Sequence, residues 1–328
     1  MKNNIAVIGG GSWGTAIVSI LSLNNTINWW IRRDDQILSI RETTKNIKYL
    51  PNCNLSTKNI MFSSNLNDVL TQSDIIIVAT PSEFINNTFK ESGKFLMNKI
   101  IVSAVKGVIP ILNLTPYQYF NKLNSTIKYG VISGPCHAEE VAMNKKSYLT
   151  FSFNDNKINS QIASYFKTNF INVKLSKDVI GTEISAILKN VYALMTGICF
   201  GLGYGDNFLA VLITASANEL QVVLNKLNPQ KRNITESAYL GDLLVTCYSL
   251  HSRNRRFGAY IGKGYSVSAT KVEMKMIAEG YNATNCIFQL LGKREILNQA
   301  PIINASYSIL YKNKSPKTTI SALSNLIG

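Results

Sequence analysis

Histidine is scarce in this chain, and its cysteines form no pattern. Among 328 residues there are two histidines, His137 and His251, and five cysteines with no C-x-x-C pair. The cysteines are Cys53, Cys136, Cys199, Cys247 and Cys286. An odd number of scattered cysteines excludes a disulfide framework and a zinc site and is typical of a reducing compartment. We therefore expect no metal, and acid–base chemistry at neutral pH falls to a lysine or a carboxylate.

Acidic residues are also few, 19 against 34 lysines and arginines, which gives a net charge of +15. Such a charge attracts anionic partners, nucleic acid among them. The basic residues are spread along the whole chain, however, and no aromatic residues interleave with a basic block. We expect an anionic small molecule as partner and no nucleic acid.

We expect no signal peptide, since residues 1–4 (Met-Lys-Asn-Asn) lead directly into the first apolar run. We therefore expect a cytoplasmic protein. The apolar region from Val191 to Ala217 is interrupted by Asp206, Asn207 and several glycines. It predicts a pair of buried helices and no stable membrane insertion.

A glycine-rich motif opens the chain. The segment Ile5–Ile17, IAVIGGGSWGTAI, runs from a buried-strand pattern through Gly9-x-Gly11-x-x-Gly14 into a helical run. The first glycine permits a tight turn, the second lets the backbone approach a pyrophosphate, and the third allows close packing of helix on strand. Amide groups at the helix start then face the phosphates. A plain strand-to-helix connector is the alternative, but this order and context predict a dinucleotide cofactor.

Short β-branched runs recur through the first half of the chain and alternate with helical segments. The runs are Ile5–Ile8, Ile27–Ile31, Ile75–Val78, Ile100–Val102, Val131–Ile132, Tyr148–Phe153 and Asn172–Leu175. This alternation predicts an α/β N-terminal Rossmann domain over residues 1–178, with a doubly wound, mostly parallel sheet. From Val179 onward the periodicity is helical, which predicts an all-α C-terminal domain over residues 179–328.

The choice of cofactor depends on the residues after the second predicted strand. An NAD-specific fold has an acidic residue there for the ribose hydroxyl, whereas this chain has Arg32 and Arg33, with acidic residues only afterwards. Planar guanidinium groups suit a 2′-phosphate, so we expect NADP(H), with NAD(H) kept open. Two solvated arginines in a loop are the alternative.

Lys189 stands alone on one face of a predicted helix whose other face is apolar. Its neighbours on that face are small and uncharged, including Thr182, Ser185 and Thr196. A solvated face normally carries several charges, so this lysine is a candidate for the wall of a cleft. A lone solvated lysine is the alternative.

A second polar stripe, Asp242, Thr246 and Ser249, follows one helical face and leads into the segment Ser252–Arg256. Its three arginines suit a phosphate, although arginines after a helix end also complement the helix dipole without a ligand. Lys106-Gly107 and Gly134–Ala138 follow predicted strand ends, where ligands bind in open α/β sheets.

These motifs together resemble the bacterial-type NAD(P)-dependent sn-glycerol-3-phosphate dehydrogenases. The resemblance spans nearly the whole chain, and the ordered matches are GGGSWGTA (9–16), YLP (49–51), VKG (105–107), SGPCHAEEVA (133–142), LKNVYAL (188–194), GLGYGDN (201–207), GDLLVTC (241–247), SRNRRFG (252–258) and AEG (278–280). It implies reduction of dihydroxyacetone phosphate to sn-glycerol 3-phosphate for phospholipid synthesis, and a cytoplasmic homodimer.

The resemblance also implies roles for individual residues. Lys189 would be the catalytic proton acceptor in the oxidation direction, with Asp242 beside it. Substrate contacts would come from Lys106, Gly134, Cys136, Lys189, Asn190, Asp242, Thr246, Ser252, Arg253 and Asn254. Cofactor contacts would come from Gly9, Gly11, Ser12, Trp13, Gly14, Arg32, Arg33, Tyr49, Lys106, Ala138, Arg253, Ile277 and Glu279.

The chain departs from the family at four positions. Cys136 replaces a usual Ser or Thr, His137 an aromatic residue, Ala215 an arginine and Asn304 a glutamate. The sequence leaves two other functions open: another two-domain dehydrogenase for a hydroxyacid or sugar phosphate, and a nucleotide-binding protein without catalysis.

Overall fold

The computed structural model describes residues 4–274 and 278–327 and divides into two compact units. The first unit is built from the chain up to Val105 and from Thr115–Val179, and the second from Lys106–Leu114 and the chain from Ile180 onward. The first is α/β and the second is helical, so the predicted fold class is confirmed. The sequence predicted one domain boundary, at residue 178. In the structure, the excursion Lys106–Leu114 belongs to the second unit, although the residues on both sides of it belong to the first.

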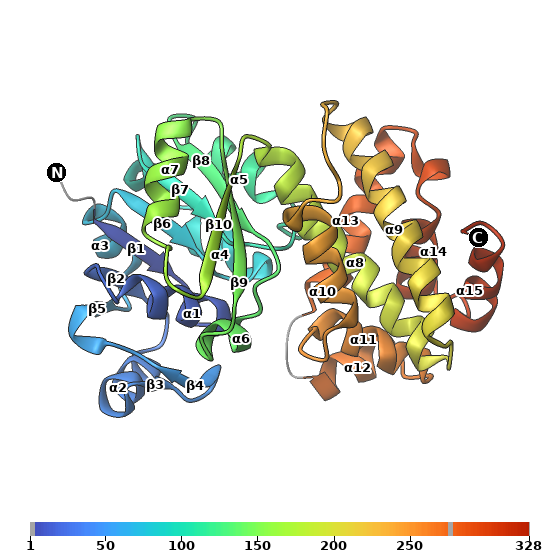
Figure 1. The fold of residues 1–328 in the computed structure, drawn as a ribbon, viewed down its shortest axis with the longest axis horizontal. Coiled ribbons are helices and arrows are strands. Elements are labelled where there is room, and N and C mark those ends of the chain that lie inside the picture. The colour runs from blue at the N-terminus through green and yellow to red at the C-terminus, as the bar shows by residue number, and fades with distance from the viewer. Residues whose placement is uncertain (1–3, 275–277, 328) are drawn as a thin grey trace. The chain divides into compact units, whose positions relative to one another are not determined.

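An eight-stranded sheet forms the centre of the first unit, in the order β10-β9-β8-β7-β6-β1-β2-β5 (Figure 1). Its strands are β1 (Ile5–Ile8), β2 (Ile27–Trp30), β5 (Ile60–Ser63), β6 (Ile75–Val78), β7 (Ile100–Ser103), β8 (Lys128–Ser133), β9 (Ser147–Phe153) and β10 (Ile171–Ser176). Neighbouring strands are parallel except β8 and β9, which are antiparallel. The seven predicted runs all form strands of this sheet; β5 and the small hairpin of β3 (Lys45–Asn46) and β4 (Leu50–Asn54) were not predicted.

The central strands have both faces covered. All four residues of β1 and all four of β6 are buried, although successive side chains of a strand point to opposite faces. Continuous apolar runs are typical of parallel strands buried in this way. The helices of this unit are α1 (Ser12–Leu21), α2 (Asp34–Thr43), α3 (Leu66–Thr71), α4 (Ser82–Phe89), α5 (Pro116–Leu123), α6 (Ala138–Ala142) and α7 (Asn156–Ser164), with short 3₁₀ turns at Thr57–Asn59 and Gly93–Leu96.

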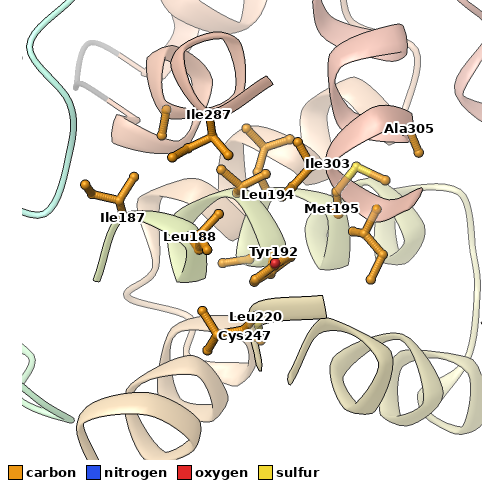
Figure 2. Packing of buried hydrophobic residues seen from close by; sticks show 14 of the residues in the cluster. Ile187, Leu188, Tyr192, Leu194, Met195, Leu220, Cys247, Ile287, Ile303 and Ala305 are labelled. Carbon is orange, nitrogen blue, oxygen red and sulfur yellow. The ribbon is translucent and has the colours of Figure 1, made fainter. Parts of the chain in front are cut away.

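The second unit packs its helices around α8 (Val179–Gly201), whose side chains form the centre of the core (Figure 2). The other helices are α9 (Asp206–Leu227), α10 (Asp242–Tyr248), α11 (Arg253–Gly262), α12 (Val267–Met274), α13 (Glu279–Lys293), α14 (Pro301–Tyr311) and α15 (Pro316–Ser324), with a π turn at Ser237–Gly241 and a 3₁₀ turn at Leu297–Gln299. Leu188 and Tyr192 of α8 share this core with Leu220 of α9 and Cys247 of α10, and all four are fully buried.

Helices α8 and α11 pack with their backbones in close contact. A Cβ atom at Gly258 would lie 1.9 Å from the carbonyl oxygen of Leu194, and one at Gly197 would lie 2.0 Å from that of Arg255. Only glycine permits such an approach at these two positions. The beginning of α11, with Arg253, is thereby held against the helix that carries Lys189.

Helices α8 and α9 are long and apolar enough to cross a membrane by length and composition alone. The apolar window of α8 is 89% buried inside the structure, and that of α9 is 44% buried. Core helices of folded proteins meet the same criteria, and its burial favours that interpretation for α8.

Glu219 is one of the buried carboxylates of the second unit, and it is not among the predicted site residues. Glu219 of α9 accepts hydrogen bonds from the backbone amides of Ile302 (2.7 Å) and Ile303 (3.1 Å), and so caps the beginning of α14. Burial raises the pKa of Glu219 from 4.5 to about 7, although the two amide hydrogen bonds act in the opposite direction. Folding therefore favours the protonated form of this group.

This shift predicts a dependence of stability on pH. A group whose pKa is raised on folding contributes stability that is complete below its unfolded pKa and is lost as pH rises through its folded pKa. Between pH 5.5 and pH 8, Glu219 should lower the free energy of unfolding by about 2 kcal/mol. Urea unfolding of the wild type and of Glu219→Gln at several pH values isolates this contribution, because other titrating groups are common to both proteins. If the free energies of unfolding of the two proteins changed in parallel with pH, the raised pKa of Glu219 would be contradicted.

Candidate active site

The glycine turn between β1 and α1 has the geometry of a phosphate cradle. Gly9 has φ +128°, and a Cβ atom at Gly14 would lie 2.2 Å from the carbonyl oxygen of Gly9. Side chains are therefore excluded at both positions. At Gly11, in contrast, a Cβ atom would meet no protein atom within 4 Å. The turn is tight on its inner side and open at Gly11, where a ligand can approach the backbone.

Side chains from α2, the helix that follows β2, and from the hairpin of β3 and β4 hold this turn in place. The amide groups of Gln36 and Asn46 donate hydrogen bonds to the carbonyl oxygen of Gly10, at 2.7 and 2.9 Å. The Ser12 hydroxyl donates to the carbonyl oxygen of Tyr49 at 2.9 Å. No role was predicted for Gln36 or Asn46, because nothing in the local sequence pattern shows that they reach the glycines.

A pocket opens beside the glycine turn and contains five of the predicted cofactor residues. Its lining is Gly9, Gly10, Gly11, Trp30, Ile31, Arg32, Arg33, Gln36, Tyr49, Thr80, Pro81, Phe84 and Thr88. The Arg32 guanidinium lies over the Phe84 ring, 5.6 Å from its centroid. Arg33 lies 3.6 Å from Asp35, measured from Nε to Oδ1, and also lines a neighbouring pocket with Lys48. Both arginines therefore lie beside the glycine turn; Trp13, the next residue after Ser12, is half-buried against the core of this unit.

Three further predicted residues follow β8 at the carboxyl edge of the same parallel strands. Gly134 has φ +125°, and a Cβ atom there would lie 2.4 Å from the carbonyl oxygen of Tyr148. The Cys136 thiol is buried and donates to the carbonyl oxygen of Gly134 at 3.0 Å. Ala138 is the first residue of α6 and is buried. The strand order β8-β7-β6-β1 brings this segment and the glycine turn to one edge of the sheet.

In the second unit, Lys189 forms an ion pair with Asp242, from Nζ to Oδ1. The side chains are only 4% and 2% exposed, so the alternative of a solvated lysine is wrong. The small residues around Lys189 do not line solvent, because α8 is buried on every side from residue 181 to 199. A buried ammonium held by one carboxylate is a costly arrangement, and such arrangements concentrate at functional sites.

The predicted substrate residues of the second unit gather around this pair. The Asn190 side chain donates to the carbonyl oxygen of Lys106 at 2.6 Å and accepts from the Asn254 side chain at 2.8 Å. Thr246 lies one turn after Asp242 on α10, and its hydroxyl donates to the Asp242 carbonyl oxygen at 2.6 Å.

Arg253 is the first residue of α11, and Ser252 caps that helix by accepting from the amide of Arg255 at 3.3 Å. The alternative, that arginines after a helix end complement its dipole, is confirmed for Arg255, which reaches Tyr248, the last residue of α10; all three arginines also lie in the first turn of α11. Arg255 donates to the carbonyl oxygen of Tyr248 at 2.8 Å and lies over the Phe200 ring, and Arg256 is exposed. Arg253 is half-buried.

The last predicted cofactor residues lie at the beginning of α13. Glu279 is the first residue of that helix, and Ile277 lies outside the described residues. Two of the unusual positions lie on other helices: Ala215 is half-buried on α9, and the Asn304 side chain of α14 donates to the carbonyl oxygen of Leu297 at 2.8 Å.

Comparison with known proteins adds independent evidence. The N-terminal domain family of NAD-dependent glycerol-3-phosphate dehydrogenase matches residues 4–159, and the C-terminal domain family matches residues 178–321. The glycerol-3-phosphate dehydrogenase [NAD(P)+] of Bacillus subtilis strain 168 is 34% identical over 325 residues, which cover 97% of this chain and 93% of the relative. The enzyme of that name from Clostridium tetani is also 34% identical, over 97% of this chain and 91% of the relative.

Solved structures agree with this comparison. The crystal structure of glycerol-3-phosphate dehydrogenase from Coxiella burnetii has a TM-score of 0.92 and 26% identity, and each chain covers 98% of the other. The Saccharomyces cerevisiae enzyme has a TM-score of 0.83 at 23% identity, which shows the common fold. With the glycine cradle and the buried lysine–carboxylate pair both present, the chain belongs to the family of NAD(P)-dependent glycerol-3-phosphate dehydrogenases.

Proposed function

We propose that this protein interconverts dihydroxyacetone phosphate and sn-glycerol 3-phosphate with NADP(H) or NAD(H), and that Lys189 exchanges the proton of the reacting oxygen. The observation that carries the proposal is the buried ion pair of Lys189 and Asp242. An ammonium withdrawn from water has a strong field, so it stabilises the negative charge that develops on the substrate oxygen as the carbonyl is reduced.

The proton steps follow from the two partners. In the reducing direction, Lys189 donates a proton to the substrate oxygen; in the oxidising direction it takes the hydroxyl proton. The Asp242 carboxylate favours the ammonium form and holds Nζ in one direction, so the proton is offered from a fixed position. Asp242 is therefore the partner that keeps the lysine charged and oriented.

The residues of the glycine turn fit a dinucleotide. The open space at Gly11 and the amide groups at the start of α1 suit a pyrophosphate, and Tyr49 lines the same pocket. Ser12 and Trp13 are proposed as further cofactor contacts on this side. When bound, the nicotinamide group supplies hydride to the substrate carbonyl or accepts it from the alcohol. Lys106, Ala138, Arg253, Ile277 and Glu279 are proposed as further cofactor contacts.

We propose that the substrate phosphate is held by Arg253 and the Ser252 segment, at the positive end of the α11 dipole. Lys106, Thr246 and Asn254 are proposed to surround the three-carbon part of the substrate, and Asn190 is hydrogen-bonded to Lys106 and Asn254. Gly134 and Cys136 are proposed as further substrate contacts.

Absorbance at the nicotinamide band tests the proposed reaction. Purified protein with dihydroxyacetone phosphate should oxidise NADPH, and sn-glycerol 3-phosphate with oxidised cofactor should run the reverse reaction. A hydroxyacid and a sugar phosphate serve as competing substrates. Cofactor binding without turnover of any of them would favour a nucleotide-binding protein, and turnover of a competitor alone would favour another dehydrogenase.

Arg32 and Arg33 predict the preference between the two cofactors. We expect Arg33→Ala to raise the Kd of NADPH about tenfold or more, because a bidentate contact to a 2′-phosphate is lost, while the Kd of NADH changes little. Fluorescence titration of each variant with both cofactors measures this ratio. Lys58→Ala, a basic residue that does not line the pocket, is the control. Equal weakening of both cofactors would exclude recognition of the 2′-phosphate.

We propose a cytoplasmic homodimer without membrane insertion or nucleic-acid binding, which supplies glycerol 3-phosphate for phospholipid synthesis. The family supports the metabolic role, and the burial of α8 supports a soluble core helix. Sedimentation of the purified protein without detergent tests both the assembly and its solubility.

A further inference from the structure

A buried chain of hydrogen bonds runs through the second unit beside Lys189. The Asn190 side chain donates from Nδ2 to the carbonyl oxygen of Lys106 at 2.6 Å, and its Oδ1 accepts from Asn254 Nδ2 at 2.8 Å. Asn254 Oδ1 in turn accepts from the backbone amide of Gly280 at 2.8 Å. The chain therefore joins four segments: the Lys106 excursion, α8, α11 and the start of α13.

The hydrogen-bonding capacity of Asn190 is largely used inside the protein. A primary amide has two N–H donors, and those of Asn190 point to the carbonyl oxygens of Lys106 (2.6 Å) and Ala186 (3.3 Å). Its side-chain oxygen already accepts from Asn254, and the residue is only 4% exposed. Asn190 thus retains no N–H donor for a substrate oxygen.

Asn254 does what a capping residue does, but from a different helix. The residue before α13, Ala278, has no side chain that caps the helix, and the second helical amide, Gly280, is satisfied by Asn254 of α11. A first-turn amide left without an acceptor destabilises the helix start. Asn254 therefore fixes where α13 begins.

The absence of a side chain at Gly280 explains how α13 comes so close to this chain of hydrogen bonds. A Cβ atom at that position would lie 2.4 Å from the Asn190 carbonyl oxygen and 3.0 Å from Asn254 Oδ1. The start of α13 lies directly on the backbone of α8 at the residue that follows Lys189. Any larger residue would push α13 away and lengthen the hydrogen bond from Gly280.

We propose that Asn190 is a positioning residue, and that the chain Gly280–Asn254–Asn190–Lys106 fixes Lys106 and the start of α13 against the helix that carries Lys189. This inference rests on the proposed function and refines it: Asn190 acts on the reaction through the groups it places, whereas Asn254 keeps one N–H that a substrate oxygen can accept. The glycine of the AEG segment is required for the packing and for no ligand contact.

Gly280→Ala tests the proposal without altering any side chain that could touch a ligand. We expect kcat to fall about 10- to 100-fold, because misplacement by about 1 Å suffices for such a loss. KM for dihydroxyacetone phosphate should change less than about threefold. Asn190→Asp should behave in the same way, since its carboxylate keeps the volume but cannot donate to the Lys106 carbonyl. Gly292→Ala is the control, because it makes the same change on the same helix where a Cβ atom finds ordinary contact at 3.4 Å.

A substrate-binding role for Asn190 gives a different pattern. Asn190→Asp would then raise KM for dihydroxyacetone phosphate, and Gly280→Ala would match Gly292→Ala in kcat; this pair of results would overturn the proposal. The double variant Asn190→Asp/Gly280→Ala should be no worse than the more impaired single variant, because both changes break one chain. Additive losses would also overturn it.

Amide exchange tests the chain independently of activity. In protein labelled with ¹⁵N-glycine, the Gly280 amide should be protected in the wild type and should exchange at least about tenfold faster in Asn254→Ala. An unprotected Gly280 amide in the wild type would refute the hydrogen-bonded chain even if no variant folded. If the wild type failed to turn over dihydroxyacetone phosphate, the proposed function would fail. The exchange result would still show whether the chain of hydrogen bonds exists.

Discussion

Lys189→Met should abolish turnover and also weaken the fold. We expect kcat to fall by about 10³-fold or more, because the proton donor and the positive charge at the substrate oxygen are lost together. The variant also leaves the Asp242 carboxylate buried without its partner, only 2% exposed. Removal of one member of a buried pair costs about 3–5 kcal/mol of unfolding free energy. Steady-state kinetics and urea unfolding measure the two losses separately.

The double variant Lys189→Met/Asp242→Asn separates chemistry from stability. It removes both charges, so most of the unfolding free energy lost in the single variant should return, whereas the activity should not. NADPH binding should survive in both variants, because the glycine cradle belongs to the first unit. Recovery of turnover with stability would show that Lys189 acts only as a structural partner of Asp242.

The sheet was largely predictable because its strands carry their own signal. Runs such as Ile75–Val78 are continuously β-branched and buried on both faces, and such runs need no tertiary information to be recognised. β5 and the hairpin of β3 and β4 lack this signal. β4 reads Leu-Pro-Asn-Cys-Asn, in which proline and asparagine disfavour a strand, and its hairpin is ordered by contacts with the glycine turn and α1.

The residues of the candidate site could be predicted from the sequence, but their burial could not. Single residues such as Lys189 and Asp242 could be selected from spacing and resemblance, but their burial depends on α8 being enclosed by helices far along the chain. The face of small residues around Lys189 resembles a cleft wall in sequence, yet it is a packing surface. The roles of Arg253 and Arg255 could not be separated from the sequence for a similar reason. They depend on the break between α10, which ends at Tyr248, and α11, which begins at Arg253.

Two similar substitutions in the glycine turn should both weaken NADPH binding strongly, but for different physical reasons. Gly11→Ala should leave the unfolding free energy within about 1 kcal/mol of the wild type. Gly11 has φ −82° and ψ −176°, which alanine adopts readily, and its Cβ atom would meet no protein atom within 4 Å. That empty space is where a pyrophosphate would approach the backbone. We therefore expect the Kd of NADPH to rise about 10- to 100-fold, since overpacking costs about 1–3 kcal/mol.

Gly14→Ala should weaken cofactor binding through the fold itself. Its Cβ atom would lie 2.2 Å from the Gly9 carbonyl oxygen, and neither backbone segment can move without displacing α1 from β1. We expect a loss of about 1–3 kcal/mol of unfolding free energy together with loss of NADPH binding. Urea unfolding and fluorescence titration of both variants separate a blocked ligand site from a broken turn. If Gly11→Ala bound NADPH as tightly as the wild type, the pyrophosphate could not lie on this turn, and the assignment of the whole cofactor pocket would have to move with it.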